Sequence, residues 1–222
     1  MHATRHPSGG WLLFCEFCSW SELRSGPQPP LETTQPETVR SSVDPARSHA
    51  SIRKRTSWSH GVRFYDRERD LLSAVAGYVV DGWTAGDVCV LIMTAEHRAA
   101  LRWRLASHGL AAARAEGRLV ELDAAGTLQA FMRDGRPDPE LFDATVGALV
   151  RECAVGARMR AFGEMVDVLW TEGNPDGALE LEALWAGLQQ TVRFTLLCGY
   201  GSSRMSSEGR SSVRAAHDHV LH

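Results

Sequence analysis

Short apolar runs alternate with segments of helical periodicity from Trp58 to Tyr200, which is the pattern of an α/β domain. The segment 87–93 (DVCVLIM) is apolar almost throughout, as is typical of an interior strand buried on both faces of a parallel sheet. The segments that predict strands are 62–65, 87–93, 119–122, 159–163 and 194–200. We therefore expect a three-layer α/β/α fold with a mostly parallel central sheet of about five or more strands.

Apolar residues at helical spacing fill the segments between these strands. The predicted helices cover 67–83, 95–107, a short segment ending near 132, 140–155, and a segment that starts after the break at 173–175. Helices that connect parallel strands cover both faces of a sheet, and ligands then bind beyond the carboxyl ends of the strands. The residues at those ends are therefore the candidates for a functional site.

Two flanking segments lack this alternation. Residues 1–57 contain six of the nine prolines together with many Ser, Thr and Arg residues, which predicts a disordered leader. Residues 202–222 are Ser-rich and predict a tail with a short helix over 213–220. We expect a leader (1–57), a folded domain (58–201) and this tail.

Charge, hydropathy and cysteine content indicate which partners and which cellular compartment to expect. The net charge is -3 with no basic face in the body of the chain, which argues against nucleic acid as a partner. The apolar run 11–17 is too short for a membrane span and contains Glu16. The five cysteines are odd in number and predict free thiols in a reducing cytoplasm: Cys15, Cys18, Cys89, Cys153 and Cys198.

Motifs for known catalytic or cofactor chemistry are missing from the sequence. Lys54 is the only lysine, so a Schiff-base lysine or a phosphate-loop lysine within the fold is excluded. Cys15 and Cys18 form a C-x-x-C without a second pair at usable spacing. His217, His219 and His222 are read as part of a surface helix or frayed terminus rather than as metal ligands. We expect no cofactor and no metal.

The stretch TAEHR, after the strand 87–93, offers polar groups at a helix start. Thr94 is placed to cap the helix, and the free amides of the first turn suit a carboxylate or another anion. Capping alone is the simpler role for Thr94. His97 and Arg98 lie off the apolar stripe and fit either ligand contact or a solvent-facing turn.

Glu164, within FGEMVDVLW, is the strongest single candidate for a functional group. An otherwise apolar segment surrounds its carboxylate, and a buried carboxylate needs a partner or a raised pKa. The alternative is a helix-start carboxylate stabilised by the helix dipole. Met165, Trp170 and Trp185 fit an apolar pocket or, more simply, the core. Glu164 and His97 together could form an acid/base pair, if the fold brings them into contact.

Quoted in order, several stretches resemble one known family, the MEDS domain, a methanogen/methylotroph and DcmR-type sensory domain. They are HGVRFYD (60–66), GWTAGDVCVLIMTAEHRAAL (82–101), GRLVELDAAGTLQAFMRDGRPDPELF (117–142), RAFGEMVDVLWTEGN (160–174), LEALW (181–185) and FTLLCGY (194–200). The resemblance implies a RecA-like fold without a phosphate loop, which agrees with the absent lysine. It also implies a sensor of small hydrocarbon-like or related ligands.

The residues that the resemblance places toward a ligand are Tyr65, Thr94, His97, Arg98, Glu164, Met165 and Trp185. The leader is foreign to the family, and no kinase or DNA-binding output domain follows, so we expect output through a regulatory partner, such as a kinase, an anti-sigma factor or a transcription regulator. The expected function is non-catalytic sensing with a mostly apolar pocket. Two alternatives stay open: a degenerate RecA-like nucleotide binder, and a hydrolase or transferase using Glu164 and His97.

Overall fold

The computed structural model describes residues 2–5, 11–14 and 59–222. The chain divides into two units, residues 1–51 and 52–222. In the first unit, β1 (His2–Arg5) pairs with β2 (Trp11–Phe14) in antiparallel fashion, where the sequence pattern had predicted no strand. The rest of the predicted leader, including Cys15 and Cys18, lies outside the described residues.

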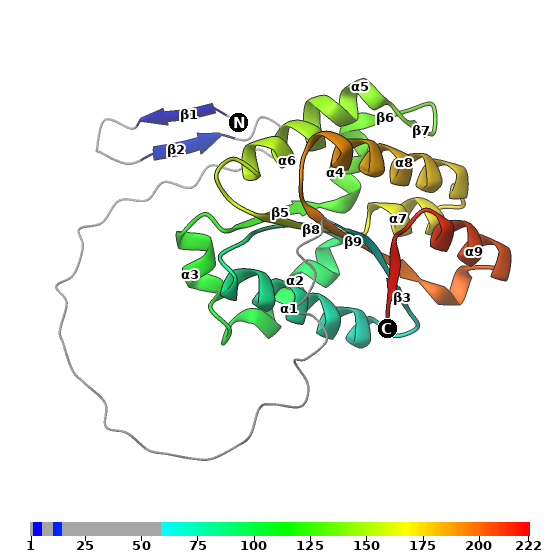
Figure 1. The fold of residues 1–222 in the computed structure, drawn as a ribbon, viewed down its shortest axis with the longest axis horizontal. Helices are drawn as coiled ribbons and strands as arrows, with labels where there is room; N and C mark the ends of the chain where they lie inside the picture. Colours follow the sequence, from blue (N-terminus) through cyan, green and yellow to red (C-terminus); the bar gives the residue numbers. More distant parts are fainter. Residues whose placement is uncertain (1, 6–10, 15–58) are drawn as a thin grey trace, which may run out of the picture. The chain divides into compact units, whose positions relative to one another are not determined.

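The second unit alternates strands and helices along the chain, as the hydrophobic pattern predicts (Figure 1). Its strands are β3 (His60–Tyr65), β4 (Val88–Met93), β5 (Leu119–Asp123), β6 (Met132–Arg133), β7 (Arg136–Pro137), β8 (Met159–Gly163), β9 (Thr195–Gly201) and β10 (His219–Leu221). Its helices are α1 (Glu68–Thr84), α2 (Ala95–Leu105), α3 (Leu110–Ala115), α4 (Ala124–Phe131), α5 (Pro139–Phe142), α6 (Ala148–Cys153), α7 (Met165–Thr171), α8 (Pro175–Thr191) and α9 (Ser207–Ala215), with a π-helical turn at Asp143–Gly147 and a 3-10 turn at Ser202–Arg204.

Six strands form one parallel sheet in the order β10-β3-β9-β8-β4-β5. The predicted α/β class with a three-layer arrangement is confirmed. The segment expected in the interior of the sheet, β4, pairs with β8 on one side and β5 on the other. Because all six strands are parallel, their carboxyl ends lie along one edge of the sheet, where the loops that follow them meet.

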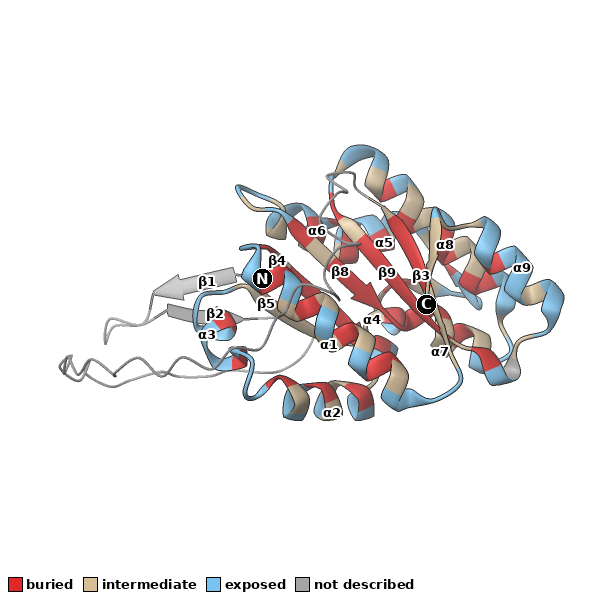
Figure 2. Ribbon diagram, turned by 60° about the horizontal axis from the view of Figure 1, so that its bottom comes forward, coloured by how far each residue is buried: buried red, intermediate tan, exposed pale blue. Residues whose placement is uncertain are grey.

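Two hydrophobic clusters cover the two faces of the sheet. On one face α1, α2 and α3 contribute apolar side chains such as Leu71, Leu101 and Leu110. On the other, helices from α4 to α9 pack around Phe142 and Trp185. Figure 2 shows the buried residues running along the sheet and the inner sides of the helices, with the exposed residues facing outward. The sheet therefore lies between two packed helical layers.

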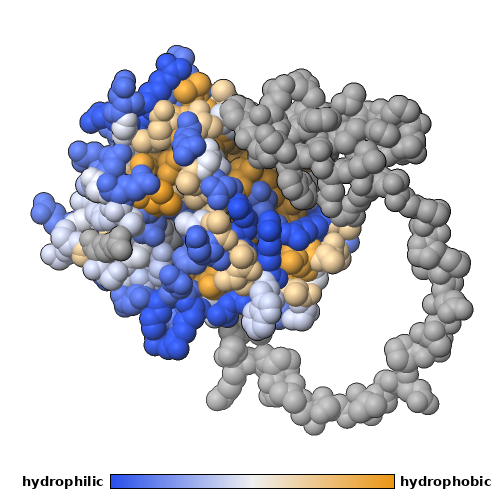
Figure 3. Space-filling view, turned by 180° about the vertical axis from the view of Figure 1, so that it is seen from behind, coloured by the Kyte–Doolittle hydropathy of each residue, from blue (hydrophilic) through white to orange (hydrophobic). Residues whose placement is uncertain are grey.

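The surface of the second unit carries few large apolar side chains. Among its described residues, the strongly exposed large hydrophobics are Trp103, at 83%, and Val155, at 80%. Figure 3 shows hydrophilic and hydrophobic residues interspersed on the face opposite that of Figure 1. In the described part of the chain, no helix combines the length and apolar character that crossing a bilayer requires.

The end of the chain differs from its predicted form. The helix predicted over 213–220 lies earlier, at Ser207–Ala215, and β10 then adds a sixth strand beside β3. The pattern did not reveal β10, because three residues are too few for strand periodicity to show. His217 was read as belonging to a surface helix or frayed end, and this was wrong: its side chain is fully buried.

Candidate functional site

A pocket of about 500 Å³ opens at the carboxyl edge of the sheet. Its residues come from the loops and helices that follow β3, β4, β8 and β9, at the edge where the sequence predicts a site. The lining residues are Tyr65, Asp66, Glu68, Thr94, Glu96, His97, Asp167, Val168, Thr171, Glu172, Gly201 and Ser203. A volume of this order suits a small-molecule ligand.

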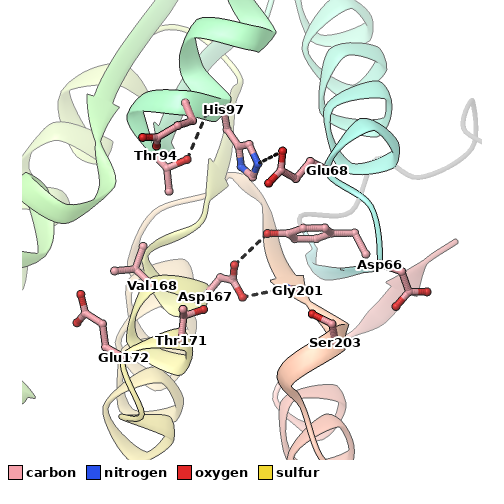
Figure 4. A pocket seen from close by; sticks show the side chains of 12 residues that line it. Asp66, Glu68, Thr94, His97, Asp167, Val168, Thr171, Glu172, Gly201 and Ser203 are labelled. Carbon is pink, nitrogen blue, oxygen red and sulfur yellow. Dashed lines mark hydrogen bonds and ion pairs between the residues drawn. The ribbon is translucent and has the colours of Figure 1, made fainter.

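Asp167 joins two strand ends across the pocket. Its Oδ2 accepts a hydrogen bond from the Tyr65 hydroxyl at 2.9 Å, and its Oδ1 accepts one from the Gly201 amide at 2.9 Å (Figure 4). Burial, together with the neighbouring Asp167 carboxylate, raises the pKa of Tyr65 well above its ordinary value. Tyr65 therefore stays a neutral hydrogen-bond donor at physiological pH, and its ring forms one wall of the pocket.

Glu164 immediately precedes α7, and its side chain forms hydrogen bonds with the start of α2. Its carboxylate, 1% exposed, accepts a hydrogen bond from the Thr94 amide through Oε2 at 2.9 Å. Its Oε1 lies 2.7 Å from Nδ1 of His97. The predicted convergence of Thr94, His97 and Glu164 at one edge is confirmed. Glu164 does not cap its own helix, α7, but satisfies an amide at the start of α2 instead.

His97 connects this buried carboxylate to the open pocket. The hydrogen bond with Glu164 raises the pKa of His97, against the opposing effect of burial, and Glu68 adds to the rise. The other ring nitrogen, Nε2, lies 3.9 Å from Glu68 Oε2, and Figure 4 shows the imidazole facing that carboxylate. Thr94 acts as the predicted cap, accepting from the His97 amide at 3.4 Å through its hydroxyl.

The pocket is strongly acidic. Five of its twelve lining residues are carboxylates, and none of the lining residues is lysine or arginine. The pocket predicted as mostly apolar is therefore polar and negatively charged. The anion expected at the first turn of α2 also has no room at the Thr94 amide, because Glu164 already occupies that position.

The remaining predicted residues do not line the pocket. Met165 and Trp185 are each 1% exposed and belong to the hydrophobic core. Trp185 packs its ring edge-on against Phe142, with 5.3 Å between ring centroids. The Arg98 guanidinium points away to Asp123, with 3.4 Å between Nη2 and Oδ2. The pocket lining thus includes Tyr65, Thr94 and His97, with Glu164 directly behind His97.

Sequence reasoning missed Asp167, Glu68 and Glu172. Asp167 follows Glu164 by three residues, so the helical spacing after β8 would have placed both carboxylates near the same strand end. Glu68 begins α1 directly after the strand end that had been singled out, Tyr65 and Asp66. Glu172 follows the last residue of α7, and its sequence context carries no comparable signal.

Comparison with known proteins adds one finding. A protein-family model, described as the methanogen/methylotroph, DcmR sensory domain (MEDS), matches residues 59–218. The match spans β3 to the residue before β10 and includes every residue that lines the pocket. A search of curated proteins returned no match.

Proposed function

The chain belongs to the MEDS family of sensory domains, and from that membership and the geometry of the pocket we propose that it is a non-catalytic small-molecule sensory domain in bacterial signal transduction or transcription control. The observation that carries this proposal is a pocket at the ends of four strands, with the hydrogen-bonded pair of Glu164 and His97 at its wall. A ligand in such a pocket contacts hydrogen-bonded side chains, and its binding can change their positions.

The charge of the lining indicates the chemistry of the ligand. Carboxylates such as Glu68, Asp167 and Glu172 disfavour an anion and attract a cation or a donor of several hydrogen bonds. The apolar atoms of Tyr65 and Val168 offer a surface that a short carbon chain can contact. We therefore propose a small organic cation with a short aliphatic part, such as a protonated amine, instead of the plain hydrocarbon-like compound first expected.

Three probes of similar size separate the possible head groups. Butylammonium, butanol and butyrate share a four-carbon chain and differ in charge. We expect butylammonium to raise the melting temperature of the full chain and to give a binding isotherm by calorimetry, whereas butyrate gives neither. Tight binding of butyrate with no binding of butylammonium would contradict the proposed ligand class. Native mass spectrometry of freshly purified protein would show any ligand that co-purifies.

A matched pair of variants locates the binding. Glu172→Gln removes a charge from the exposed rim of the pocket, and Glu152→Gln removes the same charge from an exposed position on α6, outside the lining. We expect Glu172→Gln to weaken butylammonium binding about three- to tenfold, in line with about 1 kcal/mol for a partly exposed ion pair. Equal effects of the two variants would place the binding elsewhere.

The contact between His97 and Glu164 also supports a second candidate function, a hydrolase or transferase. A carboxylate at 2.7 Å from one imidazole nitrogen orients the ring, and the other nitrogen then faces the pocket as a general base. The test is hydrolysis of p-nitrophenyl butyrate by the unmodified chain and by His97→Gln. Turnover that disappears in His97→Gln would favour the enzyme, and equal background rates would favour the sensor.

A nucleotide-binding role receives less support. The lining holds no basic side chain to balance a triphosphate, and its carboxylates repel phosphate. Equilibrium dialysis with ATP gives the decisive measurement, since clear retention of ATP would displace the sensory proposal.

We propose output through a regulatory protein partner in the cytoplasm. The helix α2 supports this proposal, because it begins at the pocket with Thr94 and His97 and carries the exposed Trp103 near its other end. A shift of the first turn of α2 would therefore move a large apolar side chain that is available for a partner. Nucleic acid is not proposed as a partner.

A further inference from the structure

A second cluster of polar side chains lies buried in the domain and shares no residue with the pocket. His60 begins β3, Cys198 lies in β9, Glu182 belongs to α8, and His217 lies between α9 and β10. One potential ligand atom from each residue lies within 4.8 Å of all the others. Among the described residues, this is the one group of three or more such side chains that could hold a metal ion.

The separations within the cluster match a tetrahedral metal site. Nε2 of His60 lies 3.4 Å from Sγ of Cys198 and 3.1 Å from Oε2 of Glu182, and that oxygen lies 3.4 Å from the same sulfur. Metal bonds of about 2.0–2.3 Å in a tetrahedron set neighbouring ligand atoms about 3.3–3.8 Å apart. The three atoms therefore form one face of a tetrahedron, and His217 supplies the fourth corner.

Two outer contacts orient the ligands as a metal site requires. Nδ1 of His217 donates to the carbonyl of Val213 at 2.7 Å, which leaves the lone pair on Nε2 directed into the cluster. The Tyr200 hydroxyl donates to Oε1 of Glu182 at 2.8 Å, so Oε2 is left for coordination. Hydrogen bonds of this kind fix the tautomer of a ligating imidazole and the orientation of a ligating carboxylate.

The protein's own hydrogen bonds leave the cluster incomplete. The buried nitrogen Nε2 of His217 makes no hydrogen bond and faces Oε1 of Glu182 at 3.3 Å. Buried polar atoms are nearly always satisfied by protein, water or an ion, so this nitrogen indicates that a further group belongs here.

We propose that His60, Glu182, Cys198 and His217 bind one Zn²⁺ ion in a closed structural site. A thiolate, two imidazoles and a carboxylate in tetrahedral arrangement suit zinc, and four protein ligands leave no position for a reacting water. The site joins two neighbouring strands, α8 and the C-terminal segment, so the metal holds that segment against the sheet.

Binding of the metal also changes the protonation of one ligand. Burial raises the pKa of the Cys198 thiol, so binding of the metal releases one proton from this sulfur as the metal–thiolate bond forms.

The experiment uses the full chain in a Cys15→Ser/Cys18→Ser background, which removes the other candidate thiol pair. Elemental analysis of the protein as purified should give about one zinc per chain. After chelation, titration with Co²⁺ should produce the near-ultraviolet cobalt–thiolate band and the intense visible bands of tetrahedral cobalt. A folded protein that carries no zinc and gives neither set of bands would overturn the proposal, leaving a metal-free hydrogen-bonded network.

Two thiol variants in the same background identify the ligand sulfur. Cys198→Ser should abolish the cobalt–thiolate band and strongly reduce the zinc content, whereas Cys153→Ser, a partly buried thiol outside the cluster, should change neither. A band that persists in Cys198→Ser would overturn the assignment. If Cys198→Ser does not fold, His217→Gln takes its place and should change the visible spectrum of the cobalt complex; an unchanged spectrum would overturn the role of His217.

Failure of this inference leaves the proposed function intact, since butylammonium binding and zinc content are separate measurements on separate sets of residues.

Discussion

At the scale of single residues, Glu164 decides how the pocket is built. Its two carboxylate oxygens contact two different partners, the Thr94 amide and the His97 ring, and its side chain is almost completely buried. A carboxylate in such a position satisfies a backbone donor at the start of α2 and favours the charged form of the His97 imidazole at the same time. Replacing it therefore changes both local stability and the electrostatics of the pocket.

Glu164→Gln is expected to fold but to lose about 1–3 kcal/mol of stability, because a neutral amide replaces a charged acceptor in a buried network. The same change should weaken butylammonium binding, because it removes a negative charge from beside the pocket. Urea unfolding and calorimetry measure the two effects. As a control, Glu152→Gln on exposed α6 should leave both unchanged. Full stability and full binding in Glu164→Gln would contradict this reading.

His97 should make stability depend on pH. Its pKa is raised in the folded state, chiefly by the hydrogen bond with Glu164, above the unfolded value of about 6.5. The resulting stabilisation is complete below pH 6.5 and is lost as the pH rises through the folded pKa. Urea unfolding between pH 5.5 and 8.5 should show a decline that is reduced in His97→Gln. The exposed His108→Gln serves as control, and an unreduced decline in His97→Gln would refute the assignment.

Residue patterns predicted part of this site. Thr94, His97 and Glu164 could be placed together because each follows a strand whose hydrophobic pattern was clear, and parallel strands end at one edge. The acidic character of the pocket could not be derived in the same way. It depends on side chains from α1 and the end of α7, and helix periodicity does not specify how those ends project over the sheet.

At the scale of elements, the C-terminal segment completes the domain. β10 pairs in parallel with β3, and the chain just before it is fixed to the first residue of β3 by two hydrogen bonds. The amide of His60 donates to Oδ2 of Asp218 at 2.7 Å, and the amide of Asp218 donates to the carbonyl of His60 at 2.8 Å. This reciprocal pair sets the register of the edge strand.

Asp218→Ala should lower the free energy of unfolding by about 1–3 kcal/mol, because the buried amide of His60 loses its acceptor. Guanidinium unfolding followed by circular dichroism gives the value. His222→Ala, an exposed change at the last residue, should have an effect below about 0.5 kcal/mol. Equal stability of the two variants would show that the edge strand adds little to the fold.

Long elements were predicted from the sequence and short ones were not. The helices α1 and α8 span 17 residues each, long enough for apolar periodicity to be clear. β6 and β7 have two residues each and β10 has three, so alternation has no room to appear. The segment 140–155 was predicted as one helix, and the structure interrupts it with a π-helical turn at Asp143–Gly147.

At the scale of the whole molecule, the second unit has all the components of an independent fold. Among the residues whose burial the structure describes, both hydrophobic clusters run from Val62 onward, and the matched family segment begins at residue 59. Deleting residues 1–51 should therefore change the melting temperature by about 2 °C or less.

Differential scanning fluorimetry of the shortened and full chains, with and without butylammonium, tests this independence. The ligand-induced shift should be the same in both. A large drop in the melting temperature, or a lost ligand response, would show that the first 51 residues contribute to the fold or to the pocket.

Glu164 also joins parts of the molecule that lie on opposite sides of the sheet. It precedes α7, which belongs to one helical layer, while its carboxylate fastens the first turn of α2 in the other layer. A ligand that draws the His97 ring aside would loosen this fastening at both helix starts together. Ligand binding in the pocket would then change the positions of helices on both faces of the sheet, without any strand of the sheet having to move.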